Sequence, residues 1–233
     1  MSLIDFPDPR DFDYSEWKRV GNYLYPVDGI VHFGGELTVE NLRNAYRMGI
    51  FPWYTPGIPL PWHCPDPRAI IEFSDLHIPR SLEKERRSGR FTFTIDKDFA
   101  TVIKACSKMR RPDQPGTWIT DEFIHAYCDL HKAGMSHSIE TWDSEGNLVG
   151  GLYGVDAGGV FCGESMFYTV PNASKLALLF LIEHLKSFGS TWLDAQVMTP
   201  HMKLLGAKEI DRIEFLQKLK ETQESELKLF DLM

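Results

Sequence analysis

The chain has 233 residues, a length that suits one large domain or a small domain joined to a larger one. Its formal net charge of −8 argues against a protein that coats nucleic acid, although a local basic patch can still contact phosphates. There is no apolar run long enough to cross a membrane, and the acidic N-terminus lacks the apolar segment of a secretory signal, so we expect a cytoplasmic protein.

Residues 1–68 are rich in proline, glycine and aromatic residues. Within them, Thr38 can cap a short helix that Gly49 ends. The turn formers and prolines of residues 50–67 are expected to exclude a regular helix or a central sheet strand. Because the composition then changes, we expect a small N-terminal domain over residues 1–68 and a larger domain over residues 69–233.

From residue 69 onward, strands and helices are mixed. The expected strands cover residues 69–73, 91–95, 137–142, 148–155, 160–167 and 191–197. The expected helices cover residues 98–108, 120–134, 172–188, 201–205 and 212–220. The Asp-Ala-Gly-Gly segment at 156–159 is a strong hairpin signal. This order predicts an α/β (α+β) fold with a mostly antiparallel mixed sheet and helices on both faces.

The cysteines and histidines give no support for a metal site. The four cysteines are scattered without a CxxC pair, which is typical of reduced thiols in a cytoplasmic protein. The eight histidines are dispersed and no HExxH motif is present, so no metal is expected.

The strand at 191–197 carries a carboxylate, Asp194, and an amide, Gln196, in a mostly apolar segment. Side chains alternate along a strand, so this pair should point to the same face. A buried carboxylate is costly unless it is paired or hydrogen-bonded. The pair is therefore either a structural polar network or the floor of a reaction site.

Two neighbouring elements could complete a pocket beside this pair. In the strand at 160–167, alternation puts Glu164 on one face with Cys162 and Met166. The next helix offers an apolar stripe formed by Leu178, Leu181 and Leu185. An apolar cavity with a few polar groups is the usual form of a small-molecule site. Periodicity alone favours a plain core for the three leucines, and an ion pair with Lys or Arg is the simpler explanation of Glu164.

Other motifs are absent or ambiguous. Neither GxGxxG nor GxxxxGK[ST] occurs, so ATP and dinucleotides have no support, and no GxSxG elbow is present. Gly150, Gly151 and Gly163 suggest close approach of the backbone to a ligand or to a neighbouring element. The basic stretch at 80–90 predicts a solvated helix face more readily than a nucleic-acid contact.

Ten short motifs, taken in order, resemble the leucyl/phenylalanyl-tRNA–protein transferase family over nearly the whole chain. They are FGGEL at 33–37, AYRMGIFPW at 45–53, PDPR at 65–68, GTWI at 116–119, HSIE at 137–140, LVGGLYG at 148–154, FCGESMF at 161–167, NASK at 172–175, DxQ at 194–196 and LGA at 205–207. No single motif is decisive, but the ordered set is highly specific.

The resemblance implies a two-domain enzyme whose larger domain is related to the GNAT acyltransferases. Such an enzyme moves Leu or Phe, and Met more weakly, from the 3′ end of aminoacyl-tRNA to the N-terminal Arg or Lys of a protein. The peptide bond that it forms creates an N-end rule degradation signal. The resemblance implies no metal and no CoA, and we expect a monomer.

The resemblance also assigns roles to residues. The catalytic groups would be Asp194, Gln196 and Glu164. The aminoacyl pocket would be lined by Leu152, Phe161, Gly163, Met166, Leu178, Leu181, Leu185 and Leu193, although simple alternation puts Leu193 opposite Asp194. Trp53 and Trp118 would lie near the 3′-terminal adenosine. The tRNA backbone would be contacted by Arg80, Lys84, Arg86, Arg87 and Arg90.

In the mechanism that we expect, Gln196 hydrogen-bonds the acceptor amine, and Asp194 orients Gln196 and stabilises the charge developing on that amine. Glu164 anchors the amine of the aminoacyl group or attracts the basic acceptor side chain. Two alternatives stay open. One is a CoA-dependent GNAT N-acyltransferase, against which the missing CoA-binding loop argues; the other is a non-catalytic RNA-binding protein of the same fold.

Overall fold

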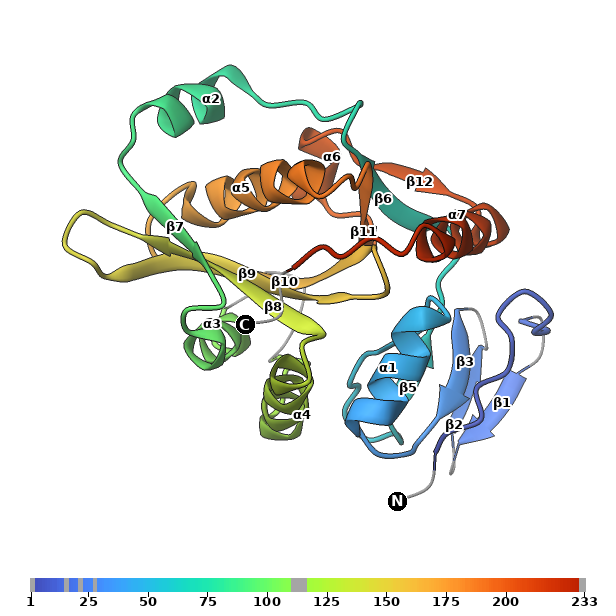
Figure 1. Cartoon of the computed structure of the whole chain (residues 1–233). Coiled ribbons are helices and arrows are strands. Elements are labelled where there is room, and N and C mark those ends of the chain that lie inside the picture. The colour runs from blue at the N-terminus through green and yellow to red at the C-terminus, as the bar shows by residue number, and fades with distance from the viewer. Residues whose placement is uncertain (1–2, 15–16, 21–22, 27–28, 110–116, 231–233) are drawn as a thin grey trace.

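The computed structural model of the chain describes residues 3–14, 17–20, 23–26, 29–109 and 117–230, so that Gly116 of the GTWI motif lies outside it (Figure 1). Its strands are β1 (Trp17–Val20), β2 (Tyr23–Pro26), β3 (Ile30–Phe33), β4 (Phe51–Pro52), β5 (Pro61–His63), β6 (Arg68–Glu72), β7 (Thr92–Ile95), β8 (Ser136–Trp142), β9 (Leu148–Asp156), β10 (Phe161–Tyr168), β11 (Trp192–Gln196) and β12 (Lys208–Ile210). Its helices are α1 (Val39–Arg47), α2 (Arg80–Arg87), α3 (Phe99–Ser107), α4 (Asp121–Lys132), α5 (Ala173–Ser187), α6 (Pro200–Leu204) and α7 (Arg212–Glu224).

The main sheet has seven strands in the order β12-β6-β11-β10-β9-β8-β7. Every neighbouring pair is antiparallel except β10 and β11, which are parallel. Helix α5 covers one face, and α3 and α4 cover the other (Figure 1). The predicted fold class, a mostly antiparallel mixed sheet with helices on both faces, is confirmed.

The small sheet near the N-terminus corrects one prediction. Residues 50–67 were expected to hold no central strand, yet β5 is the middle strand of the three-stranded sheet β3-β5-β4. Pro61 is the first residue of β5, a position where a proline without an N–H is tolerated. The next residue, Trp62, is fully buried and pairs with both neighbouring strands, so packing compensates for the poor strand propensity.

Local signals begin and end α1 as predicted. Thr38 caps α1 by accepting a hydrogen bond from the N–H of Asn41 at 3.2 Å, and Thr120 caps α4 in the same way. Gly49 ends α1 with a positive φ of 75°. A Cβ at Gly49 would lie 2.8 Å from the ring of Phe215, so the first region packs too closely against α7 for any side chain there.

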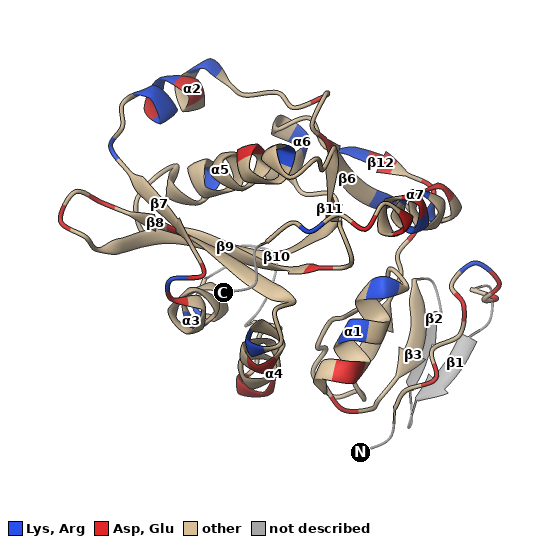
Figure 2. Ribbon diagram, viewed as in Figure 1, with Lys and Arg blue, Asp and Glu red and all other residues tan. Residues whose placement is uncertain are grey.

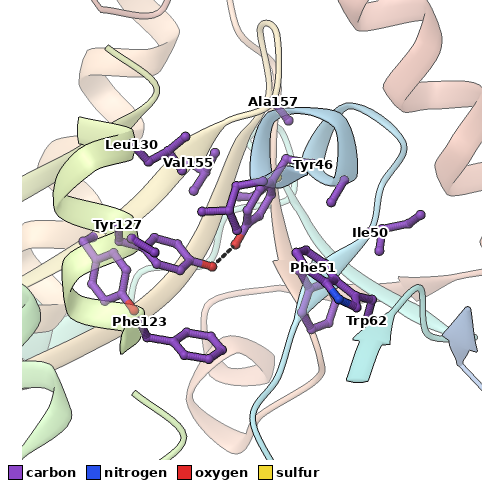
Figure 3. Close-up of a cluster of buried hydrophobic side chains, with 14 of the residues drawn as sticks. Tyr46, Ile50, Phe51, Trp62, Phe123, Tyr127, Leu130, Val155 and Ala157 are labelled. Carbon is purple, nitrogen blue, oxygen red and sulfur yellow. Dashed lines mark hydrogen bonds between the residues drawn. The ribbon is translucent and has the colours of Figure 1, made fainter. Parts of the chain in front are cut away.

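Two hydrophobic cores lie on the two faces of the main sheet. The first joins α1, α3 and α4 and includes Tyr46, Phe51, Trp62 and Tyr127 (Figure 3). The second lies beneath α5. The first core contains residues from both sides of residue 68, so the two regions are packed together, and a domain boundary at residues 68–69 stays a prediction.

Candidate active site

Two β-bulges open the main sheet between β10 and β11. These strands are parallel neighbours, with Cys162 opposite Asp194. Just beyond this pair, the pairing of β10 with β9 shifts at Glu164, and that of β11 with β6 shifts between Asp194 and Gln196. A bulge adds an unpaired residue and bends its strand, so the two strands separate here. Across the opening, Gln196 Nε2 donates to Glu164 Oε1 at 2.7 Å.

The bulges overturn two predictions that rested on simple alternation. The extra residue at Glu164 places Cys162 in the first core and Met166 against the second, not on one face. In β11, Gln196 has a φ of 62°, and this left-handed turn directs its side chain into the cavity described below. Asp194 pairs with Ile70 and Gln196 pairs with the preceding residue of β6, Ala69, so the pair does not share a face.

Asp194 is held by an arginine that the sequence analysis did not identify as its partner. Arg68 Nε and Nη2 donate to the two oxygens of Asp194 at 2.9 and 2.6 Å, and Nη1 donates to the carbonyl of Gly49 at 3.1 Å. The guanidinium lies over the rings of Phe51 and Phe215. Burial alone would lower the pKa of Arg68, but the charge and hydrogen bonds of Asp194 outweigh it and raise the pKa. The sequence did contain one signal of this role, because a charged residue, Arg68, begins the otherwise apolar strand segment Arg-Ala-Ile-Ile.

Asp194 acts on Gln196 through the main chain. Asp194 Oδ1 accepts a hydrogen bond from the backbone N–H of Gln196 at 2.8 Å. The amide side chain of Gln196 is instead bonded to Glu164. The carboxylate of Asp194 therefore fixes the turn that presents Gln196, and Asp194 itself is not among the residues that line the cavity.

Glu164 is surrounded by uncharged donors, not by the Lys or Arg that was the simpler expectation. Its Oε1 accepts from Tyr46 Oη at 2.6 Å, and its Oε2 lies 3.4 Å from Tyr127 Oη. The two hydroxyls are 2.5 Å apart, and a dashed line in Figure 3 marks the hydrogen bond between them. Burial raises the pKa of Glu164 to about 7, although the hydrogen bonds from Tyr46 and Gln196 pull it down.

Tyr46 and Tyr127 were not among the predicted site residues. Both are buried, and burial together with the charge of Glu164 raises the pKa of each hydroxyl well above its usual value. The sequence offered little to reveal them, because α1 and α4 contact Glu164 only after the chain has folded.

A cavity of about 320 Å³ lies above Glu164 and Gln196. Of the predicted aminoacyl pocket, it is lined by Leu152, Phe161, Gly163, Met166, Leu178, Leu181 and Leu193. Leu185 is fully buried in the second core and is not among the lining residues. The sequence analysis missed further lining residues, which are Tyr153, Ser165, Ala195, Val197, Thr199, His201 and Met202.

Trp53 and Trp118 both line the same cavity. Their ring centroids are 5.6 Å apart with planes inclined by 35°. Trp118 is buried and packs its ring against the edge of Phe123, whereas Trp53 is half-buried. At the rim, burial and then the charge of Lys175 lower the pKa of His201 to about 4, so its imidazole is neutral at neutral pH.

The glycines of this region differ in what they approach. A Cβ at Gly150 would lie 2.6 Å from Ala173 Cβ, and one at Gly151 would lie 2.5 Å from the carbonyl of Ile139. At these two positions the absence of a side chain therefore lets α5 and β8 pack closely against β9. Around Gly163 the nearest atom would be 3.7 Å away, and this glycine opens onto the cavity.

The predicted tRNA-backbone residues, Arg80, Lys84, Arg86, Arg87 and Arg90, lie on or just after α2, which packs beside α5 (Figure 2). Glu83 accepts hydrogen bonds from Arg86 and Arg87 at 2.8 and 2.7 Å, and Glu85 lies 3.3 Å from Arg90. Exposed ion pairs of this kind are weak, so the arginines can exchange these carboxylates for phosphates.

Within the described ranges, no group of three His, Cys, Asp or Glu side chains is arranged to hold a metal ion. A separate search of the described helices finds none with the length and apolar character needed to span a membrane.

Comparisons with known sequences agree on one family. The sequence model of the leucyl/phenylalanyl-tRNA protein transferase family matches residues 70–220, and the model of that family's N-terminal domain matches residues 35–66.

Several curated proteins described as leucyl/phenylalanyl-tRNA–protein transferases are similar to the chain. The protein of Pseudoalteromonas atlantica is 48% identical over 83% of this chain and 82% of its own length. That of Sulfurimonas denitrificans is 50% identical over 82% and 83%. That of Oleidesulfovibrio alaskensis is 44% identical over 93% and 84%. Among solved structures, L-PGS from Bacillus licheniformis superposes with a TM-score of 0.39 at 17% identity, over 58% of this chain and 47% of that one.

Proposed function

The chain belongs to the leucyl/phenylalanyl-tRNA protein transferase family, and from this premise we propose that it moves Leu or Phe from aminoacyl-tRNA to the N-terminal Arg or Lys of a protein. The observation that carries the proposal is the hydrogen bond between Gln196 and Glu164 at the floor of an apolar cavity. It brings two polar groups to the place where an aminoacyl ester and an amine would meet.

The cavity supports an apolar aminoacyl donor. Its lining combines aliphatic, thioether and aromatic side chains, and its volume is near the lower end of the range of about 300–1,000 Å³ for ligand pockets. Leu, Phe and Met are unbranched at Cβ and can enter end-on, whereas Val and Ile would crowd the entrance. A pocket of this kind discriminates by only about 1–3 kcal/mol per methylene, so Met is expected to be a weaker substrate.

The two tryptophans support an adenosine beside the aminoacyl pocket. Trp53 and Trp118 line the same cavity as Leu178 and Leu181, so one ligand could occupy both parts. Stacking of an unpaired base on an aromatic ring contributes about 1–3 kcal/mol. The basic side chains of α2 would then contact the tRNA backbone. Backbone contacts carry no sequence information, which suits an enzyme that recognises its donor tRNA by the 3′ end.

The acceptor amine would bind to Gln196. Because Gln196 Nε2 is bonded to Glu164, its carbonyl oxygen Oε1 is directed to accept a hydrogen bond from the amine. The ester is already activated, so positioning can supply much of the rate. The amine attacks the ester carbonyl, the bond to the 3′-oxygen breaks, and the ribose 2′-OH relays a proton to that oxygen. Asp194 would act by fixing the turn that presents Gln196.

One assay tests the proposal. The protein is incubated with labelled Leu-tRNA and a peptide that begins with Arg, beside the same peptide acetylated at its N-terminus and a reaction with acetyl-CoA. Transfer to the free peptide alone is the expected result. Acetyl transfer from CoA would favour a GNAT acyltransferase, and tRNA binding without transfer would favour a non-catalytic RNA-binding protein.

Gln196→Ala provides the matched variant. It should lower transfer strongly while leaving the affinity for a Phe-adenosine amide, which cannot react, nearly unchanged. Full transfer by this variant would contradict the assigned role of Gln196.

A further inference from the structure

The protons of the Glu164 cluster, formed by Glu164, Tyr46 and Tyr127, can be counted. Three oxygen–oxygen contacts link these side chains, at 2.5, 2.6 and 3.4 Å. When Glu164 is ionised, only the two tyrosine protons are available for them. Tyr46 then donates to Glu164 Oε1, and the single proton of Tyr127 can serve either the contact with Tyr46 or the 3.4 Å contact with Glu164 Oε2, but not both. The cluster therefore has a place for one more proton, on Oε2.

The tyrosines themselves cannot serve as bases near neutral pH. Burial raises the pKa of both hydroxyls well above the usual value, so they stay protonated and act as donors. Burial raises the pKa of Glu164 to about 7, which suits a group that takes up and releases a proton at neutral pH. The ionisable groups that face Glu164 from the surrounding elements are Tyr46 on α1, Tyr127 on α4, Asp194 on β11, Arg68 on β6 and Cys162 on β10.

Glu164 is also the carboxylate that can reach a substrate. It lines the cavity, whereas Asp194 does not and is bonded to Arg68. Within the part of the chain that the structure describes, Glu164 forms no ion pair with Lys, Arg or His. Gln196 is a neutral amide and a very poor base. Its hydrogen bond to Glu164 connects the amine that it binds to a stronger base, the carboxylate of Glu164.

We propose that Glu164 accepts the proton released by the acceptor amine, and that Tyr46 and Tyr127 are positioning residues that hold its carboxylate toward the cavity. This inference rests on the proposed function and names the base within it. The acceptor arrives mainly as an ammonium, because its ordinary pKa is about 7.7–8.0. Over the reaction it loses two protons as its nitrogen forms the new bond to the carbonyl carbon. One is relayed to the leaving 3′-oxygen, and the other goes to Glu164 and then to solvent.

The first 68 residues take part in the reaction site. Tyr46 comes from α1, so the region before β6 supplies a group that completes the reaction site.

The test is the pH dependence of transfer by the full chain, with labelled Leu-tRNA and an Arg-initiated peptide, corrected for spontaneous ester hydrolysis. The variants are Glu164→Gln, Tyr46→Phe and Tyr127→Phe. Tyr14→Phe is the matched control, because it removes a half-buried hydroxyl that donates to the carbonyl of Pro9, away from Glu164. The acceptor amine titrates equally in all of them, so differences between the variants report on the enzyme.

Glu164→Gln should lower transfer by about 10²–10⁴-fold and remove the rise in activity near pH 7. Tyr46→Phe removes a hydrogen bond that lowers the pKa of Glu164, so its profile should move to higher pH, with a large loss at pH 6 that disappears above pH 8. Tyr127→Phe should show a smaller shift in the same direction, and Tyr14→Phe none.

An unchanged profile in Glu164→Gln would overturn the assignment of the base. An equal fractional loss at every pH in Tyr46→Phe would mean that the tyrosine is only structural. If a tyrosine variant fails to fold, the isosteric Glu164→Gln variant still decides the question. Failure of wild-type protein to transfer at all would instead refute the proposed function.

Discussion

The buried ion pair between Arg68 and Asp194 provides the sharpest test of what holds the site together. Arg68→Met keeps an unbranched apolar side chain between Phe51 and Phe215 but removes the guanidinium. Asp194, fully buried, would then lose two hydrogen bonds and its only counter-charge among the described contacts. We expect the protein to remain folded but much less stable.

The magnitude follows from the asymmetry of buried pairs. Removal of one partner leaves an uncompensated charge and costs about 3–5 kcal/mol, whereas replacement of both by apolar residues is often neutral. In the double variant Arg68→Met/Asp194→Leu, one cost remains, because the backbone N–H of Gln196 loses its acceptor. An unsatisfied buried donor costs about 1–3 kcal/mol. The double variant should therefore be more stable than Arg68→Met but less stable than wild type.

Urea denaturation followed by tryptophan fluorescence measures these differences, with midpoints and slopes fitted together. Transfer activity should be low in the double variant, which lacks the carboxylate that fixes the turn presenting Gln196. The reasoning would be refuted by an Arg68→Met variant within about 1 kcal/mol of wild type, or by a double variant no more stable than the single one.

Three further predictions concern the cavity. Trp118→Ala should weaken binding of a Phe-adenosine amide by about 1–3 kcal/mol, measured by calorimetry, whereas Trp142→Ala, outside the cavity, should not. Leu181→Phe should reduce transfer of Phe more than that of Leu, while Leu185→Ala, behind the lining, should cost about 2–5 kcal/mol of stability without changing that ratio. The folded protein binds the proton of Glu164 more tightly than the unfolded chain does. Between pH 4.5 and 7, wild type should therefore lose up to about 3 kcal/mol of stability relative to Glu164→Gln. The prediction is contradicted if the difference in urea midpoint between wild type and Glu164→Gln is the same at both pH values.

Elements with strong local signals could be predicted from the sequence. Thr120 and Gly134 mark the two ends of α4, and the four-residue turn at 156–159 joins β9 to β10. The strands β5 and β12 could not be predicted in the same way. Each has only three residues, too few to show a period, and each exists because a neighbouring strand pairs with it.

In the site, too, some residues could be predicted from the sequence and others could not. Glu164 and Gln196 were chosen from their chemistry and from the family resemblance, and both line the cavity. Their partners were not found, because Tyr46 lies 118 residues from Glu164 and Arg68 lies 126 residues from Asp194. The bulges that turn Gln196 toward the cavity also leave no local signal, since a single inserted residue looks the same as regular alternation until the register is known.

The two carboxylates of the site differ in their surroundings, and this difference is the best guide to their roles. Asp194 is bonded to a guanidinium and to a backbone N–H, both of which fix it in place. Glu164 faces two hydroxyls and an amide, and burial raises its pKa to about 7. Groups whose environments diverge in this way commonly take different parts in a reaction. A carboxylate locked to an arginine is suited to hold a backbone turn, whereas one that exchanges a proton at neutral pH is suited to activate an amine. Asp194 and Glu164 therefore cannot be interchanged: an exchange of their side-chain lengths, Asp194→Glu with Glu164→Asp, should abolish transfer even though the charge and the number of carboxylates stay the same.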